Sequence, residues 1–224
     1  MMWSCSGGEG AALGTHEEVT FVSKFTRAFT GRGAHGRDPR LPPGQYDTGG
    51  GWPVLTAEVT PKVSTDSWTF KVEGLVDHPT TWTWDDIHQL PVSTYSGDIH
   101  CVTTWSKLGM TFTGVSVDAL LAVAGVRPTA THVVAASQTG YTTNLPLDDI
   151  MGGRAWVAWE ADGEPLPVAH GGPARLLVPH LYFWKSAKWV SSLRILDHDE
   201  PGFWEQNGYH NRGDPWLEQR YQGD

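Results

Sequence analysis

Residues 170–194 read HGGPARLLVPHLYFWKSAKWVSSLR and combine strand-forming runs with a concentration of positive charge. The runs ARLLVP (174–179) and KWVSSLRIL (188–196) are rich in apolar and β-branched residues, which is typical of β-strands. The window contains no Asp or Glu, although the whole chain has a formal net charge of −9. Its cations are interleaved with apolar residues, and they are Arg175, Lys185, Lys188 and Arg194.

This charge pattern has two explanations. A solvated basic face would account for cations that lack acidic neighbours. Cations buried among Leu, Val, Phe and Trp need an anionic partner instead, and since the window offers no carboxylate, we expect a bound anion. Arg suits phosphate through its planar fork and Lys acts as a point charge, while Gly171 and Gly172 allow the backbone to approach a ligand closely.

Outside this window the predicted strands outnumber the predicted helices. Strand-like runs occupy residues 53–59, 67–76, 131–137 and 155–160. The best helix is GVSVDALLAVAG (114–125), which Ser116 can cap and Gly125 can end. Shorter helices are predicted within 81–91 and 145–151. This irregular order favours an α+β fold over regular βαβ units.

Length and composition indicate a folded domain preceded by an arm. The 224 residues suit one domain or two small ones, and 39% hydrophobic residues can form a core. Residues 1–41 are rich in Gly, Arg and Pro and are expected to form an irregular, mobile arm, so the domain is expected to span 42–224. The twelve Trp residues either fill the core or form an aromatic wall or sugar-stacking platform.

The charge and the hydrophobic pattern also exclude some classes of protein. The acidic balance argues against nucleic-acid binding. No run approaches the ~18 apolar residues of a membrane span. The N-terminus, MMWSCSGGEGAALG, lacks the basic and apolar regions of a secretory signal, so we expect a soluble, cytoplasmic protein.

The two cysteines, Cys5 and Cys101, are too few for a disulfide framework. Cys101 lies in GDIHCVTTW (97–105), where strand-like residues lead into a loop. From the residues alone, it could be a small buried hydrophobe, a metal ligand, or a thiolate nucleophile with a histidine partner. A zinc site has little support, because the adjacent His100 would point to the opposite face of a strand and no second cysteine is near.

Four motifs resemble the sulfite oxidase family of molybdopterin enzymes and occur in that family's order. They are DIHCVTTWS (98–106), LPVAHGGPARLLVP (166–179), WKSAKW (184–189) and FWEQNGYHNRGDPW (203–216). The resemblance extends from about residue 42 to the last residue and is greatest to short bacterial sulfite-oxidase-like proteins. It implies a β-rich α+β fold, a single molybdopterin-binding domain with mixed sheets and short helices.

The resemblance also implies the ligands of a Mo-molybdopterin cofactor. In the family one cysteine thiolate binds molybdenum and the cofactor supplies the other sulfur ligands, and Cys101 matches that cysteine. His170 and Arg175 match the pterin-binding pair, and His170 follows the sulfite oxidase branch rather than methionine sulfoxide reductases, which carry Asn there. Further cofactor contacts are implied at Ser137, Ser186, Ala187 and Lys188. The N-terminal contacts are expected near 46–55.

Two residues are implied on the substrate side of the metal. Tyr209 matches the tyrosine beside the metal in sulfite oxidases, and it could also pin the tail to the core. Those enzymes carry an arginine soon after the metal cysteine, where this chain has TTWSK (103–107). Lys107 could supply that charge, or it could be a solvated surface lysine. The missing arginine leaves the identity of the substrate open.

The resemblance therefore implies oxygen-atom transfer at molybdenum, with Cys101, Tyr209 and Lys107 as the catalytic residues. The substrate would be a small oxo donor or acceptor. We expect a separate electron-transfer partner, since no haem domain is present, and a monomer, since the dimerisation domain of larger relatives is absent. The alternatives are sulfoxide or N-oxide reduction at the same centre, and a non-catalytic or carbohydrate-binding module that would hold no metal.

Overall fold

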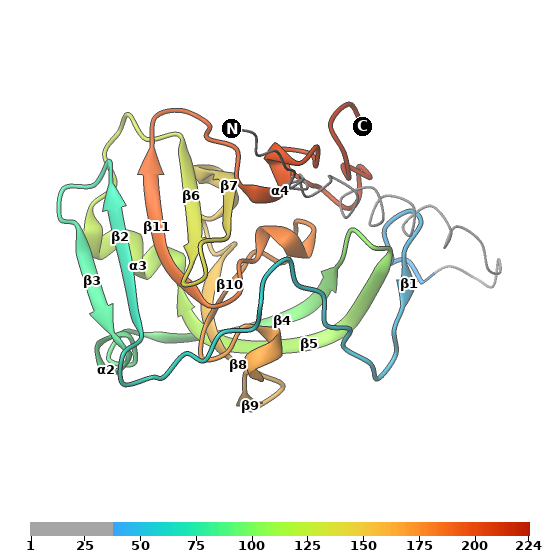
Figure 1. Ribbon diagram of the computed structural model, residues 1–224, viewed down its shortest axis with the longest axis horizontal. Coiled ribbons are helices and arrows are strands. Elements are labelled where there is room, and N and C mark those ends of the chain that lie inside the picture. The colour runs from blue at the N-terminus through green and yellow to red at the C-terminus, as the bar shows by residue number, and fades with distance from the viewer. Residues whose placement is uncertain (1–37) are drawn as a thin grey trace, which may run out of the picture. The chain divides into compact units, whose positions relative to one another are not determined.

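The computed structural model describes residues 38–224, which form two β-sheets and a few short helices (Figure 1). Residues 1–37 of the predicted arm, and Cys5 with them, lie outside the described residues. Residues 38–41 form a turn, and the domain boundary at residue 42 stays a prediction. No helix within the described residues is long and apolar enough to cross a membrane.

The six-stranded sheet is built on a long hairpin of two strands, β4 (Val92–His100) and β5 (Trp105–Ser116). β5 pairs antiparallel with β4 and β8 and parallel with β1. β8 also pairs antiparallel with β9 and β10. The other four strands are β1 (Tyr46–Asp47), β8 (Trp156–Ala161), β9 (Glu164–Pro165) and β10 (Arg175–Leu177).

The five-stranded sheet has the order β3-β2-β11-β6-β7. Its central strand β11 pairs parallel with β2 and antiparallel with β6. Because both sheets contain parallel and antiparallel pairs, the predicted β-rich fold with mixed sheets and short helices is confirmed. The strands are β2 (Thr69–Gly74), β3 (Thr80–Thr83), β6 (His132–Ser137), β7 (Thr142–Pro146) and β11 (Val190–Leu196).

Helix α3 (Val117–Ala124) follows β5 directly and confirms the strongest helix prediction. The N–H of Ala119 donates to Oγ of Ser116 over 3.3 Å, which caps the first turn. Gly125 closes the helix at φ 70°, a left-handed conformation that glycine adopts without strain. The apolar face joins the main core, where each buried leucine contributes about 1.5–3 kcal/mol. Its buried residues are Val117, Leu120, Leu121 and Ala124.

The remaining helical elements are short. In α2 (Trp84–Ile87) the side chains of Thr83 and Asp86 each accept the other residue's backbone N–H, a capping box that the sequence TWTWDD encodes locally. The others are η1 (Leu147–Asp149), η2 (Val168–His170), η3 (Phe183–Lys185) and α4 (Phe203–Gln206).

Two buried clusters form the core, and tryptophan contributes to both. The larger cluster lies among α3, the five-stranded sheet and β8 and β10. The smaller one surrounds the turn between β4 and β5 and includes Cys101, which places that sulfur inside a packed aromatic environment. Filling the core is therefore confirmed for the buried tryptophans, which are Trp68, Trp82, Trp105, Trp159, Trp184 and Trp189.

One strand prediction is wrong and several strands are missed. Residues 53–59 have strand-like composition but pair with no strand, and Val54, Leu55 and Val59 are exposed. Strand-like composition alone therefore does not produce a strand at these residues. The sequence prediction also misses most of β5, which reads WSKLGMTFTGVS, and it misses β7 and the short strands β1, β3 and β9.

Candidate cofactor-binding site

Cys101 lies in the tight turn that joins β4 to β5, as the sequence predicts. Its N–H donates to the carbonyl of Trp105 (2.8 Å), and its carbonyl accepts from the N–H of Thr104 (3.0 Å) and from Nε2 of Gln45 (3.0 Å). Thr104 adopts φ 75°, a left-handed conformation that is uncommon for a β-branched residue. These bonds fix the backbone on both sides of the sulfur, so the hairpin sets the direction of the thiol.

The thiol of Cys101 is buried, with 8% of the residue exposed, and its Sγ lies 3.2 Å from Oγ1 of Thr103. Burial raises the pKa of the Cys101 thiol, while the hydrogen bond with Thr103 and the positive charge of Lys188 act in the opposite direction. A metal ion that binds this sulfur must therefore displace a proton. Among residues 38–224, no group of three or more His, Cys, Asp and Glu side chains gathers that could hold a metal ion.

His170 and Arg175 are brought together by a glycine turn after η2. Gly171 adopts φ 108°, and a Cβ added to it would lie 3.0 Å from Cβ of Arg175 and 3.1 Å from Cα of Lys188. A side chain there would force Arg175 or Lys188 to shift and would be strained at this φ. The close approach of the three predicted cofactor residues His170, Arg175 and Lys188 therefore depends on a glycine at position 171.

Arg175 is a buried cation, 1% exposed, that donates to main-chain carbonyls. Its Nη1 donates to the carbonyl of His170 (2.8 Å) and its Nη2 to the carbonyl of Ser186 (2.7 Å), and its guanidinium lies 3.9 Å from the ring centroid of Phe183. Burial lowers the pKa of Arg175 to about 9. The side chain thus ties two predicted cofactor segments together.

One segment beside β10 is fixed by hydrogen bonds, and it consists of Ser186, Ala187 and Lys188. Oγ of Ser186 accepts the N–H of Val178 (2.8 Å), and the carbonyl of Ala187 accepts the N–H of Leu176 (2.8 Å). Nζ of Lys188 donates to the carbonyls of Ala169 and Leu55, both over 2.7 Å. Burial and then the charge of Arg175 lower the pKa of Lys188 to about 8. The ammonium is therefore held in place by carbonyls, and no carboxylate of residues 38–224 forms an ion pair with it, although the charge of Glu58 acts on its pKa.

The prediction that the buried cations of 170–194 need a bound anion is wrong for Lys185. Its Nζ lies 2.6 Å from Oε1 of Glu205, and both side chains are fully buried. Glu205 belongs to α4, so the carboxylate comes from a segment that the acid-free window does not include. Arg194 likewise pairs with Glu200 at 2.5 Å, on the surface.

Ser137 lies at the turn between β6 and β7, where its hydroxyl accepts hydrogen bonds from the backbone of the turn. Its Oγ accepts the N–H of Thr139 (3.2 Å) and of Tyr141 (3.1 Å). Oε1 of Glu58 accepts from the same turn, from the N–H of Tyr141 (3.0 Å) and from the hydroxyl of Thr139. The carboxylate of Glu58 therefore accepts hydrogen bonds in the turn that contains Ser137, a predicted cofactor contact.

Tyr209 follows α4 and is 7% exposed. Its ring lies 4.7 Å from that of Trp204 and 5.2 Å from that of Trp184, so it does pin the tail to the smaller core cluster. Burial raises the pKa of the Tyr209 phenol well above its usual value, and the charge of Cys101 adds to the rise. Tyr209 and Cys101 therefore interact electrostatically in the same cluster.

Lys107 lies near the start of β5 and is half-buried, so it is not a fully solvated surface lysine. Its charge acts on His170, whose pKa falls to about 4 through burial, then through Arg175, Lys188 and Lys107. Four predicted site residues are therefore linked electrostatically, and His170 is neutral at pH 7.

The sequence prediction misses the residues that cover this group. The ring of Trp52 stacks on His170 with centroids 3.7 Å apart and planes 12° apart, and the carbonyl of Leu55 accepts from Lys188. Both lie in the range 46–55, where N-terminal contacts are expected but not assigned. The only available signal was GGGWP (49–53), in which glycines precede one large ring.

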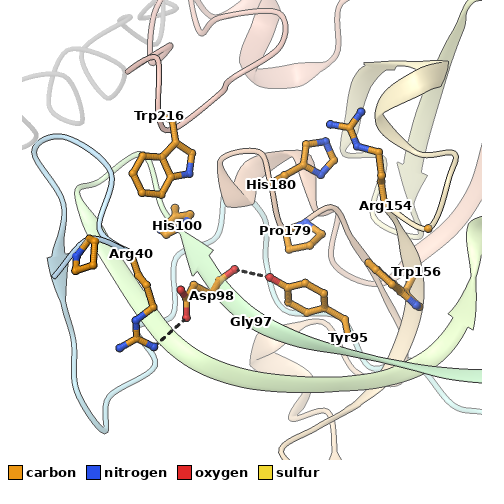
Figure 2. Close-up of a pocket in the computed structure, with 12 residues that line it drawn as sticks. Arg40, Tyr95, Gly97, Asp98, His100, Arg154, Trp156, Pro179, His180 and Trp216 are labelled. Carbon is orange, nitrogen blue, oxygen red and sulfur yellow. Dashed lines mark hydrogen bonds and ion pairs between the residues drawn. The ribbon is translucent and has the colours of Figure 1, made fainter.

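A cleft of about 600 Å³ opens beside β4 and is separate from these residues (Figure 2). Figure 2 shows Arg40 and Asp98 on one side of it and Arg154 and His180 on the other. Its lining includes His100, directly before Cys101, but none of the predicted cofactor residues that the structure describes. The cleft is therefore a neighbouring surface feature and not the predicted cofactor site.

The sequence matches the family described as oxidoreductase molybdopterin binding domain over residues 57–204. The chain therefore belongs to the sulfite oxidase type of molybdopterin-dependent oxidoreductases, which confirms the resemblance that the four motifs indicate. It is an enzyme that uses molybdenum with molybdopterin.

Individual relatives support this assignment. The "uncharacterized oxidoreductase YuiH" of Bacillus subtilis is 44% identical over 83% of this chain and 93% of that protein. A putative protein-methionine-sulfoxide reductase subunit, YedZ1 of Azospira oryzae, is 28% identical over 66% of this chain. The protein-methionine-sulfoxide reductase catalytic subunit MsrP of Gluconobacter oxydans is 30% identical over 62%. This chain spans about half the length of the last two, 56% and 50% respectively.

Among solved structures, the sulfane dehydrogenase SoxCD from Paracoccus pantotrophus is similar with a TM-score of 0.58 and 26% identity. The match covers 62% of this chain and 41% of that one. The similarity therefore concerns the shared molybdopterin-binding part and leaves most of the longer chain outside the comparison.

Proposed function

We propose that this protein transfers oxygen atoms at a molybdenum centre bound by Cys101, in the manner of sulfite oxidases, with a small oxo donor or acceptor as substrate. One observation carries the proposal. The buried thiol of Cys101 interacts electrostatically with Lys188, which lies beside the buried cation Arg175. A metal-bound thiolate and a phosphorylated pterin are both anionic, and both require such positive surroundings.

The residues present fit a Mo-molybdopterin cofactor. Neither Arg175 nor Lys188 forms an ion pair with a carboxylate among residues 38–224, so both charges are free to neutralise an anion. Lys188 has three donor hydrogens and gives two to carbonyls, which leaves one for a ligand. Arg175 and Lys188 would hold the phosphate end, and His170, Ser137, Ser186 and Ala187 would seat the pterin. When bound, the cofactor supplies the oxygen-atom transfer itself.

The protein's contribution begins with the proton on Cys101. The thiol must lose this proton when it becomes a ligand, and its raised pKa opposes that loss in the empty site. The charge of Lys188 lowers the cost, and the interaction is mutual, since the charge of Cys101 raises the pKa of Lys188. Loading is therefore expected to release a proton and to favour neutral or mildly alkaline pH.

Two further residues would act on the substrate. Tyr209 keeps its phenolic proton at neutral pH, because burial raises its pKa, and it can donate a hydrogen bond to a substrate oxygen. Lys107 would attract an anionic substrate in place of the arginine that sulfite oxidases carry. Because His170 is neutral at pH 7, Lys107, Arg175 and Lys188 supply the positive charge near it.

A second candidate is the reverse reaction, reduction of a sulfoxide or N-oxide. It is favoured by the missing arginine after Cys101 and by the two relatives whose names describe protein-methionine-sulfoxide reductases. Steady-state assays with sulfite and with methionine sulfoxide separate the two directions. Turnover of sulfite alone supports the first, and turnover of methionine sulfoxide alone supports the second.

The central test is metal analysis of protein made in a host that synthesises the cofactor. Wild type should contain close to one molybdenum per chain, and Cys101→Ser should contain less than about a tenth of that, because the thiolate ligand is lost. Cys5→Ser is the matched control and should retain the wild-type content. Equal molybdenum in wild type and Cys101→Ser would show that Cys101 is not the ligand.

Electrons released or consumed in either direction need a second protein. We propose a separate electron-transfer partner, since two relatives are named as a reductase subunit and a catalytic subunit, which indicates that those proteins act together with a second protein. With an oxidisable substrate and no added acceptor, or with a sulfoxide and no added donor, the purified holoenzyme should stop after one two-electron equivalent. Continuous turnover without an acceptor would contradict this.

A further inference from the structure

A buried glutamine connects the turn that carries Cys101 to the cleft beside β4. Gln45 is 7% exposed, and its Nε2 donates to the carbonyl of Cys101 over 3.0 Å. Its Oε1 accepts from the hydroxyl of Ser106 over 3.2 Å, and Oγ of Ser106 lies 2.8 Å from Nδ1 of His100. His100 lines the cleft (Figure 2), so three buried polar side chains form a chain from the wall of the cleft to the predicted metal ligand.

The pairing of β1 with β5 places Gln45 at this turn, although 56 residues separate it from Cys101 in the sequence. The next residue, Tyr46, pairs in parallel with Trp105, and its N–H donates to the carbonyl of Thr104 over 3.0 Å. The fold therefore brings an amide side chain against the predicted metal-ligand turn from a separate segment of the chain.

Each polar atom of this chain has one role that fits its neighbours. The carbonyl of Cys101 can only accept, so the atom of Gln45 that faces it is the donating Nε2, and Oε1 then faces Ser106. The hydroxyl of Ser106 gives its single hydrogen to that oxygen and therefore accepts from the Nδ1–H of His100. A reversed amide would set two carbonyl oxygens against each other. The chain thus holds the amide in one orientation, with a donor fixed on the carbonyl of Cys101.

The turn itself is closed without Gln45, because the N–H of Thr104 already donates to the carbonyl of Cys101 over 3.0 Å. Burying the amide is costly unless it is hydrogen-bonded, and Ser106, which is 0% exposed, provides one of its bonds. The second bond to the carbonyl therefore adds a fixed dipole beside the predicted metal ligand. Groups that hydrogen-bond to a ligating residue orient it and tune the metal, and changing one typically costs about 10- to 100-fold in metal affinity or activity.

We propose that Gln45, oriented by Ser106 and His100, is a positioning residue that fixes Cys101 for molybdenum and raises the reduction potential of the metal. The role rests on the proposed function and is exerted through Cys101, without contact between Gln45 and the reacting atoms. The positive end of the Nε2–H dipole points at the carbonyl of Cys101, so it favours the more electron-rich, reduced metal.

The first arm of the test measures how fast iodoacetamide alkylates Cys101 in cofactor-free protein, in a Cys5→Ser background so that one thiol remains. Gln45→Met should be alkylated about 5- to 10-fold faster than the background chain, because the loss of one hydrogen bond lets the turn open more often. Gln222→Met is the matched control, since Nε2 of Gln222 donates over the same 3.0 Å to the carbonyl of Glu205, and it should react at the background rate. An unchanged rate in Gln45→Met, or an equal increase in both variants, would overturn the proposal.

The second arm measures the midpoint potential of molybdenum in the holoenzyme by redox titration, a quantity that a merely structural role would leave unchanged. Gln45→Met should shift the redox equilibrium about tenfold toward the oxidised metal, which lowers the potential by about 30 mV for a two-electron couple. Ser106→Ala should lower it by less, because the donor stays but is no longer held in one orientation, and this variant decides the case if Gln45→Met does not load the cofactor. Gln222→Met should keep the wild-type potential.

The outcomes separate this proposal from the one beneath it. Molybdenum that depends on Cys101, with a potential that neither Gln45→Met nor Ser106→Ala lowers, would overturn the positioning role alone. Molybdenum content that is independent of Cys101 would overturn the proposed function, and this inference with it.

Discussion

Lys185 and Lys188 are three residues apart in the same acid-free window, yet they have opposite surroundings. The ammonium of Lys185 is fully buried against the carboxylate of Glu205 and two main-chain carbonyls, those of Asn144 and Asn211. The ammonium of Lys188 donates to two carbonyls, forms no ion pair with a carboxylate of residues 38–224, and interacts with the charge of Cys101. One lysine completes a structural ion pair, and the other keeps its charge available.

The comparison shows that a cation without acidic neighbours in the sequence does not by itself indicate an anion-binding site. What matters is whether the folded chain supplies the missing anion from elsewhere. Glu205 supplies it for Lys185, whereas no carboxylate of the described residues 38–224 forms an ion pair with Lys188. Predictions that separate stability from cofactor retention can therefore test whether the two lysines differ in function.

The largest effect is expected from Lys185→Met. It leaves the carboxylate of Glu205 buried and unpaired, which should lower the free energy of unfolding by about 3–5 kcal/mol. Denaturant titration of the cofactor-free protein measures this. The double variant Lys185→Met with Glu205→Gln should recover part of the loss. A loss below about 1 kcal/mol would show that the pair is not structural.

The next effect is a pH dependence centred on His170, which lies beside Lys188. Its pKa is about 4 in the folded protein and about 6.5 when unfolded, so the unfolded chain binds more protons between these values. Stability should therefore decrease as the pH falls from about 6.5 to 4, by up to about 3 kcal/mol from this residue.

Denaturant titrations of wild type and His170→Asn across this range isolate its contribution, because the variant should show a shallower decrease. His78→Asn, at an exposed position, is the control and should follow wild type. The same slope in His170→Asn as in wild type would place the proton uptake elsewhere, for example at His100, whose pKa also falls to about 4 through burial.

The smallest change in stability is expected from Lys188→Met. Loss of its hydrogen bonds to carbonyls should cost the cofactor-free protein about 1 kcal/mol. Retention of molybdopterin should instead fall about 10- to 100-fold, because a charge-assisted contact is lost. Released pterin fluorescence and molybdenum content report this. Full cofactor content in Lys188→Met, or a stability loss as large as that of Lys185→Met, would remove the distinction between the two lysines.

Features encoded by neighbouring residues could be predicted from the sequence. Helix α3 was predictable because Ser116 and Gly125 lie at its two ends, and the short helix α2 because Thr83 and Asp86 cap each other. The loop position of Cys101 likewise follows from the local pattern. The family assignment came from motif order, which composition alone does not encode.

Features that depend on distant segments could not be predicted. Residues 53–59 have strand composition, but whether a strand forms depends on a partner that the sequence does not reveal. The partner of Lys185 is Glu205, and the ring that covers His170 is Trp52, each brought in by the fold. The roles of the site residues, the cytoplasmic location and the monomeric state stay predictions.

The pairing of Lys185 with Glu205 has a consequence for incomplete copies of this enzyme. Glu205 and Tyr209 occupy the same short stretch near the carboxyl terminus, so a premature stop codon or a protease cut before residue 203 removes both together. In such a product the ammonium of Lys185 would be buried without the carboxylate of Glu205, and the product would be recognised as misfolded. Loss of the tail is therefore expected to lead to degradation, so that no stable truncated enzyme with an altered specificity would accumulate.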